Sequence, residues 1–250
     1  MDSRHSTVAA NTLLGLAYRS REAELTQDYP QVLTLLCSHF IGMEEGFAAI
    51  RKLAEGRVRL RLWAEESLLL TLTPEELAVR SGVDDHVRSS RPTPPSTLET
   101  DALFIPVLSL SLLSRLTQLD TSDSFVQAIV SALCAGKPVG AIALGAQPQH
   151  YLWGERGLAQ VRPLLQAKMQ AMVAEVEGYG ITLLEPDQLS NWPASAAAPL
   201  HKQVLTAEDI HTAYRLGSSR ISLRQQAIVT PLAADLARQY GIELQTNSKR

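Results

Sequence analysis

The chain has 250 residues, of which 45% are hydrophobic and 20% are charged, and this balance excludes a wholly disordered polypeptide. The formal net charge of −3 provides no basic field of the kind that attracts nucleic acid or anionic lipid, so neither partner is expected. The two cysteines, Cys37 and Cys134, stand apart in apolar segments, which argues against a disulfide framework and favours a reducing, cytoplasmic setting.

The first sixty residues alternate between helical and strand-like patterns. Residues 1–30 are predicted to form an N-terminal helical segment, because the stretch 8–24 is amphipathic. The apolar run 32–37 is typical of a strand that is covered on both faces, and a second run, 58–63, predicts another strand. Between them, apolar side chains at helical spacing predict a helix over 42–53.

The middle of the chain continues this alternation after a loop. Thr73 followed by Pro and two acids predicts the start of a helix of about ten residues. Residues 81–100 are rich in Pro and polar side chains, which predicts an irregular loop. A strand is predicted over 102–107 and helices over 109–119 and 125–135. The apolar stretch at this strand is much shorter than the roughly 20 residues of a membrane span, so none is expected.

Two further strands complete the predicted domain. They are expected over 138–144 and 180–184, with a long helix over 161–176 between them. Strands that alternate with helices in this way favour a parallel sheet with helices on both faces. We therefore predict a doubly wound α/β domain over residues 31–186.

The last quarter of the chain is predicted to be a separate, smaller unit. Residues 187–204 are rich in Pro, Ala and Ser without periodicity, which predicts a linker. Residues 205–250 are predicted to form a small α/β subdomain. Its expected elements are helices over 207–216 and 232–240 and strands over 227–230 and 242–244.

Three predicted loops follow strands of the larger domain, at residues 38–42, 109–111 and 145–150. Ligands of open parallel sheets bind outside the carboxyl ends of the strands, where helix N-termini and hydroxyl or amide side chains suit a phosphate. Ser109 and Ser111 have this position. The alternative is that both serines only cap a helix, and spacing alone favours this alternative because serine is a common capping residue.

Several sharper fingerprints are missing from the sequence. It contains neither GxGxxG nor GxxxxGK[ST], which argues against a conventional dehydrogenase or kinase. The six histidines show no metal-ligand spacing, so no metal site is predicted, and no catalytic residue is assigned. His39 follows a predicted strand beside a possible phosphate loop, but a structural role is favoured for it. Cys37 is predicted to be a small buried hydrophobic residue.

An ordered series of short motifs resembles a known family. The series comprises Asp101-Ala-Leu-Phe-Ile-Pro106, Leu113-Ser-Arg-Leu116, Lys137-Pro138-Val139, Trp153 and Leu164-Leu165. It is similar to the flavoprotein family of homo-oligomeric flavin-containing Cys decarboxylases, over about residues 30–186. This resemblance implies a flavodoxin-like sheet that binds FMN, and a homo-oligomer.

The resemblance also implies flavin-contacting residues. By position, Ser109 and Ser111 would contact the flavin phosphate or ribityl chain, Ser38 lies in the first phosphate loop, and Asp123 stands near a motif Asp of the family. Gln147 lies in the segment that replaces the family's Met-Asn pair, and Ser111 stands where the family has Asn. The family's decarboxylases carry a His before the Asp that precedes the strand, whereas residues 91–100 contain none. Decarboxylation is therefore not expected.

The C-terminal segment carries a second resemblance. The box Ala227-Ile-Val-Thr-Pro-Leu-Ala-Ala-Asp235 is similar to the ends of proteins encoded with bacterial microcompartments for propanediol or ethanolamine utilisation. The alternative is a generic strand–helix–strand packing unit. The leading hypothesis is an FMN-binding flavoprotein within or on a microcompartment, with shell or cargo proteins as partners. The alternative hypothesis is a degenerate, non-catalytic flavoprotein fold that serves as an assembly or scaffold protein.

Overall fold

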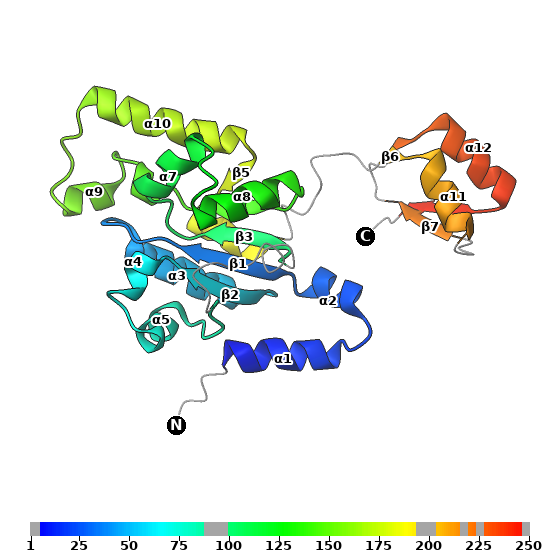
Figure 1. The fold of residues 1–250 in the computed structure, drawn as a ribbon, viewed down its shortest axis with the longest axis horizontal. Helices are drawn as coiled ribbons and strands as arrows, with labels where there is room; N and C mark the ends of the chain where they lie inside the picture. Colours follow the sequence, from blue (N-terminus) through cyan, green and yellow to red (C-terminus); the bar gives the residue numbers. More distant parts are fainter. Residues whose placement is uncertain (1–5, 88–99, 194–203, 216–219, 224–227, 247–250) are drawn as a thin grey trace. The chain divides into compact units, whose positions relative to one another are not determined.

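The computed structural model describes residues 6–87, 100–193, 204–215, 220–223 and 228–246. The chain divides into two compact units, residues 1–197 and 198–250. The first unit contains a five-stranded parallel sheet with the order β2-β1-β3-β4-β5 (Figure 1). Its strands are β1 (Gln31–Leu36), β2 (Arg59–Ala64), β3 (Ala102–Ile105), β4 (Val139–Ala141) and β5 (Ile181–Leu183). This strand order is that of flavodoxin-like folds, which confirms the predicted fold class of the larger domain.

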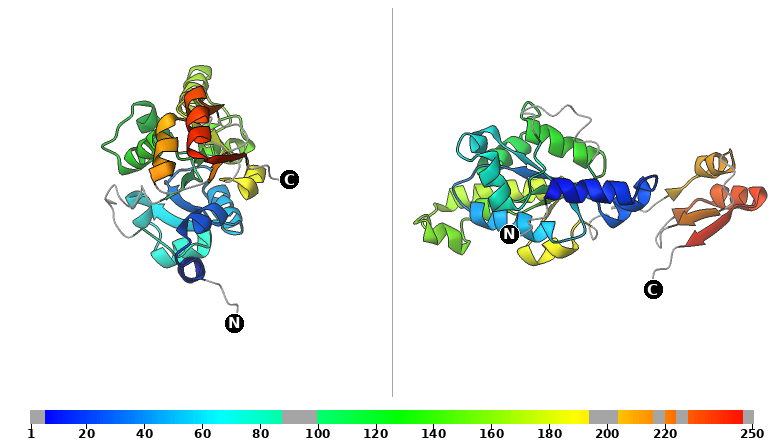
Figure 2. Two further views of the ribbon diagram at one scale, coloured as in Figure 1. Left: turned by 90° about the vertical axis from the view of Figure 1, so that its right-hand side faces the viewer. Right: turned by 90° about the horizontal axis from the view of Figure 1, so that it is seen from below.

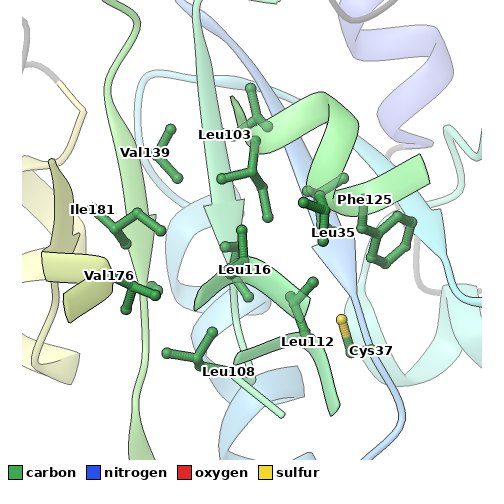
Figure 3. Packing of buried hydrophobic residues seen from close by; sticks show 14 of the residues in the cluster. Leu35, Cys37, Leu103, Leu108, Leu112, Leu116, Phe125, Val139, Val176 and Ile181 are labelled. Carbon is green, nitrogen blue, oxygen red and sulfur yellow. The ribbon is translucent and has the colours of Figure 1, made fainter. Parts of the chain in front are cut away.

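Helices cover both faces of this sheet. Successive side chains of each strand point to opposite faces, and since nearly all of them are apolar, both faces must be covered. Leu33 and Leu35 of β1 belong to one apolar cluster (Figure 3), and Val32 and Leu36 belong to the other. The first face is covered by α7 (Leu110–Thr117), α8 (Ser124–Cys134) and α10 (Pro163–Gly178). The second is covered by α3 (Met43–Ala54) and α5 (Pro74–Ser81), with α4 (Glu66–Leu69) between β2 and α5. Residues 88–99, most of the predicted loop 81–100, lie outside the described residues.

The N-terminal segment differs from the single helix expected over 8–24. It forms α1 (Thr7–Ala17) and α2 (Glu22–Asp28), and the chain turns between them at Ser20, which has a φ of 68° (Figure 2). None of the residues of α1 is buried, and Asn11 holds this helix to the sheet edge by donating hydrogen bonds to the Leu60 carbonyl and Asp85. No helix among the described residues is long and apolar enough to cross a membrane.

Two other expectations fail in the first unit. The strand expected over 138–144 ends at Ala141, and a 3₁₀ turn, η1 (Leu144–Ala146), and a short helix, α9 (Tyr151–Glu155), follow it. The predicted linker 187–204 begins too early, because η2 (Pro186–Asn191) places Leu189 and Trp192 in the core. The Trp192 ring lies where Gly140 leaves space, since a Cβ on that glycine would come within 2.8 Å of the ring.

The second unit consists of two consecutive strand–helix–strand segments. They are β6 (Val204–Leu205), α11 (Ala207–Arg215) and β7 (Arg220–Leu223), then β8 (Ile228–Val229), α12 (Pro231–Tyr240) and β9 (Glu243–Thr246). Strand β6 pairs in parallel with β8, and β7 pairs in parallel with β9. The sequence patterns predicted the helices and the strands β8 and β9 but missed β6 and β7. Ile210, Ala233 and Ala237 form the centre of its small core.

Candidate functional site

The strand order places the topological switch point of the sheet between β1 and β3. The chain passes from β1 to β2 on one side and then returns to place β3 on the other side of β1. The helices that follow β1 and β3 therefore lie on opposite faces of the sheet. This topological switch point is where open α/β sheets bind their ligands. In this chain the switch point is flanked by residues 37–42 after β1 and 106–109 after β3.

Three loops that were expected to surround a ligand meet at this point. Gly145, just beyond β4, approaches both of the other loops so closely that a Cβ on it would lie 3.0 Å from His39 Cδ2 and 3.0 Å from the Leu108 carbonyl oxygen. Gly42 ends the first loop with a φ of 82°, a conformation that favours glycine. The prediction that the loops after β1, β3 and β4 converge is therefore correct.

The His39 side chain occupies the centre of this convergence. The Ile41 N–H donates to Nδ1 at 3.2 Å, so the proton of a neutral ring is on Nε2. Nε2 is buried, and among the described residues no acceptor forms a hydrogen bond of ordinary geometry with it. Burial lowers the pKa of His39, and the adjacent Gly145 backbone, which lies close enough to Nε2 to act as a weak acceptor, opposes this shift. A neutral imidazole whose Nε2–H lacks a full hydrogen bond therefore lies where the three loops meet.

Aromatic rings extend outward from His39. The Phe40 ring lies 4.3 Å from the His39 ring and 5.7 Å from that of Trp153, measured between centroids. The Trp153 indole donates to the Leu144 carbonyl at 3.1 Å, which holds α9 against η1. Phe40 itself is exposed. The sequence analysis assigned His39 a structural role, and its contact with Gly145 joins segments more than a hundred residues apart, so no local pattern reveals it.

Ser109 and Ser111 open α7 at the carboxyl edge of the sheet. Ser109 is buried, and its hydroxyl caps the helix by accepting a hydrogen bond from the Leu112 N–H at 3.1 Å. Ser111 lies in the first turn and is exposed. The first N–H groups of a helix lack partners within the helix and carry partial positive charge. The capping interpretation thus holds for Ser109, while the Ser111 hydroxyl remains accessible to a ligand.

Ser38 and Cys37 continue the site at the end of β1. Ser38 is exposed, and its N–H donates to a Glu65 carboxylate oxygen at 2.9 Å. Cys37 is buried, as predicted, and burial raises the pKa of its thiol. The negative charges of Glu65 and Asp123 raise that pKa further, and a hydrogen bond with the Ser109 hydroxyl opposes the shift only in part. Cys37 is therefore protonated and poorly suited to act as a nucleophile.

Asp123 and Gln147 have different surroundings. Asp123 caps α8 by accepting hydrogen bonds from the N–H groups of Phe125 at 2.9 Å and Val126 at 3.0 Å, and it forms an ion pair with Arg115. Gln147 is half-buried after η1, where its carbonyl accepts a hydrogen bond from the His150 N–H at 3.0 Å. The side chain of Asp123 is thus engaged by its own chain. The described residues contain no group of three potential metal ligands.

Comparisons with known proteins give structural similarity only. No family model matches the sequence. No curated protein matches it either. Among solved structures, an FMN-dependent cysteine decarboxylase of thioviridamide biosynthesis is similar with 17% identity and a TM-score of 0.47, covering 68% of this chain and 98% of that one.

Two further structures resemble the chain to a comparable degree. The FMN-binding protein AtHal3 has 15% identity and a TM-score of 0.45, covering 69% of this chain and 99% of its own. A dodecameric FMN-dependent UbiX-like decarboxylase from Escherichia coli O157:H7 has 15% identity and a TM-score of 0.44, covering 74% of this chain and 92% of its own. The fold assignment rests on the strand order of this chain, not on these similarities.

Proposed function

We propose that residues 31–186 bind FMN between the loops after β1 and β3. The observation that carries this proposal is the meeting of three loops at Gly145, directly at the switch point of the sheet. In flavodoxin-like folds with this strand order, FMN binds at the switch point between β1 and β3. The motif series that resembles the flavin-containing Cys decarboxylases supports the same cofactor.

The phosphate would bind at the N-terminus of α7. The exposed Ser111 hydroxyl and the first-turn N–H groups provide donors there, and the buried Ser109 fixes the start of the helix. The N-terminus of α3 is less suitable, because Glu44 and Glu45 lie in its first turn. Ser38 and Gln147 would contact other parts of the cofactor from the neighbouring loops, and Asp123 would act indirectly by holding Arg115.

A redox role fits this chain better than decarboxylation. Flavin supplies hydride and electron chemistry when it is bound, while the protein orients it and excludes water. Cys37 is protonated and enclosed, and residues 91–100 lack the histidine of the decarboxylating relatives. We propose no substrate.

FMN titration monitored by flavin absorbance and fluorescence tests this function. Wild type is expected to bind FMN more tightly than riboflavin, because only FMN carries the phosphate. Ser111→Asp should weaken FMN binding at least about tenfold by placing a negative charge beside the phosphate, while riboflavin binding changes little. Ser114→Asp, on the same helix but away from its first turn, is the matched control. No FMN binding up to about 100 μM, equivalent to about −5.5 kcal/mol, would contradict the proposal.

A second candidate function is supported by the position of His39. Its ring fills the space over Gly145, and Asp123 is engaged as a helix cap and ion-pair partner, as in a fold that has lost its cofactor. Such a protein would be a non-catalytic assembly or scaffold component. It would bind no FMN, and Ser111→Asp would leave its association with other proteins unchanged.

We also propose that the chain works in the cytoplasm with a bacterial microcompartment, and that the second unit provides the contact. The support is the box 227–235, of which Thr230 caps α12 by accepting a hydrogen bond from the Ala233 N–H at 3.3 Å. Co-sedimentation with assembled compartments tests this association. It should be lost when residues 198–250 are removed and retained in Ser111→Asp.

A further inference from the structure

The outer face of α10 is unusually apolar for an exposed helix. Met169, Met172 and Val176 point into the protein, and Figure 1 shows α10 as the outermost helix over α7. The opposite face carries no charge along its centre. It consists of Leu164, Ala167, Ala171, Ala174 and Gly178, all exposed and spaced alternately by three and four residues. This spacing is that of the seam of a coiled coil.

One large apolar side chain belongs to this outer face, at the N-terminal end of α10. Leu164 is 85% exposed, whereas Leu165 continues the inward row of Met169, Met172 and Val176. An exposed leucine in line with small apolar side chains is typical of a surface that packs against another protein.

Two opposite charges beside this face, Lys168 and Glu175, indicate that its partner is a second copy of the chain. Lys168 and Glu175 are exposed and one heptad apart, so they lie on the same flank of the outer face. No described residue forms an ion pair with Lys168, and Glu175 accepts a hydrogen bond from the Tyr179 hydroxyl. A twofold axis perpendicular to the helix near Ala171 would bring each charge to its opposite in a second, antiparallel copy. The flank is therefore complementary to itself.

We propose that α10 packs antiparallel against α10 of a second copy of this chain, about a twofold axis near Ala171. Lys168 of each copy lies beside Glu175 of the partner subunit, so one contact forms twice, as in isologous interfaces. The small side chains at Ala167, Ala171 and Ala174 let the two helices approach closely. Leu164 reaches the partner's Gly178, where nothing lies within 4 Å of the position that a Cβ would occupy.

Charge reversal on the full chain tests this interface by sedimentation velocity between about 1 and 100 μM. Wild type is expected to form a dimer, or an even-numbered assembly that contains it. Lys168→Glu and Glu175→Lys should each weaken the dimer about tenfold. Each change places two side chains of the same charge beside each other at both equivalent contacts between residues 168 and 175. The double variant Lys168→Glu/Glu175→Lys should restore wild-type affinity to within about threefold, since the swap keeps the complementarity.

Glu177→Lys is the matched control, because it changes the same charge on the opposite flank of α10 and should leave association unchanged. Circular dichroism verifies that all variants are folded. A monomer at every concentration, a closed trimer, a dimer insensitive to both single reversals, or a double variant as weak as the singles would each overturn this interface. The test requires no flavin, so its outcome is independent of the proposed FMN site.

Discussion

The imidazole of His39 connects two of the three loops of the candidate site. Its Nδ1 accepts a hydrogen bond from the Ile41 N–H of its own loop, and its ring packs against Gly145, which in turn approaches the Leu108 carbonyl of the third loop. A buried donor without a full hydrogen bond lowers the stability of the folded state. An oxygen atom that accepted a hydrogen bond from His39 Nε2 would therefore stabilise this arrangement of the loops. At this scale the sequence predicted which residues end the strands, whereas it could not show that a side chain from one loop fills the space beside another.

The buried His39 should make stability fall as the solution is acidified. Burial lowers its pKa below the usual value of 6.5, so the unfolded chain takes up a proton at a pH where the folded protein does not. Stability is then complete above about pH 6.5 and declines as pH falls below it, because the unfolded state binds more protons. Urea unfolding of wild type and His39→Asn from about pH 5 to 7.5 measures this, and the variant should show the smaller slope. Equal slopes would contradict it.

The sequence could not show which of the two serines at the start of α7 is accessible to a ligand. Ser109 and Ser111 look alike in the sequence, yet one is a buried cap and the other is exposed. Which of the two hydroxyls stays accessible depends on where the first helical turn begins, and such boundaries shift by one or two residues without a clear sequence signal.

Among the elements, η2 shows how a core segment can resemble a linker. Its Pro, Ser and Asn content gives no periodicity, but Leu189 and Trp192 pack against α3 and the sheet face above Gly140. The long apolar run of β1 was predicted because burial on both faces of the sheet requires it. Strand β4 was predicted too long because the apolar residues beyond Ala141 continue into the turn η1, where burial persists without strand geometry.

Truncation of Leu189 should therefore destabilise the first unit although it lies in a segment of linker-like composition. Leu189 is 0% exposed, and removing a buried leucine side chain costs about 2–5 kcal/mol. Leu70→Ala is the control, because Leu70 is 88% exposed and should cost less than about 0.5 kcal/mol. Chemical denaturation followed by tryptophan fluorescence measures both changes. If the two variants lost similar stability, η2 would not be part of the core.

In the molecule as a whole, the two units differ in the structure available to stabilise them. The first has a five-stranded sheet covered on both faces, whereas the described residues of the second form two two-stranded sheets and a small core around Ile210, Ala233 and Ala237. Isolated two-stranded pairs are marginally stable, and small units bury a smaller fraction of their surface. The alternation of strands and helices predicted both units, but the short β6 carries too few residues for a pattern to be detected.

The second unit should therefore open far more often than the first. Hydrogen exchange followed by mass spectrometry is expected to show at least about tenfold lower protection in α11 and α12 than in β1 and β3, since local opening follows the buried area of each unit. Removing residues 198–250 should leave the protection of β1 and β3 and the melting temperature of the first unit within about 2 °C of the full chain, because each unit has its own core. Equal protection in both units, together with a clear fall in melting temperature on truncation, would show instead that the two units unfold as one cooperative structure.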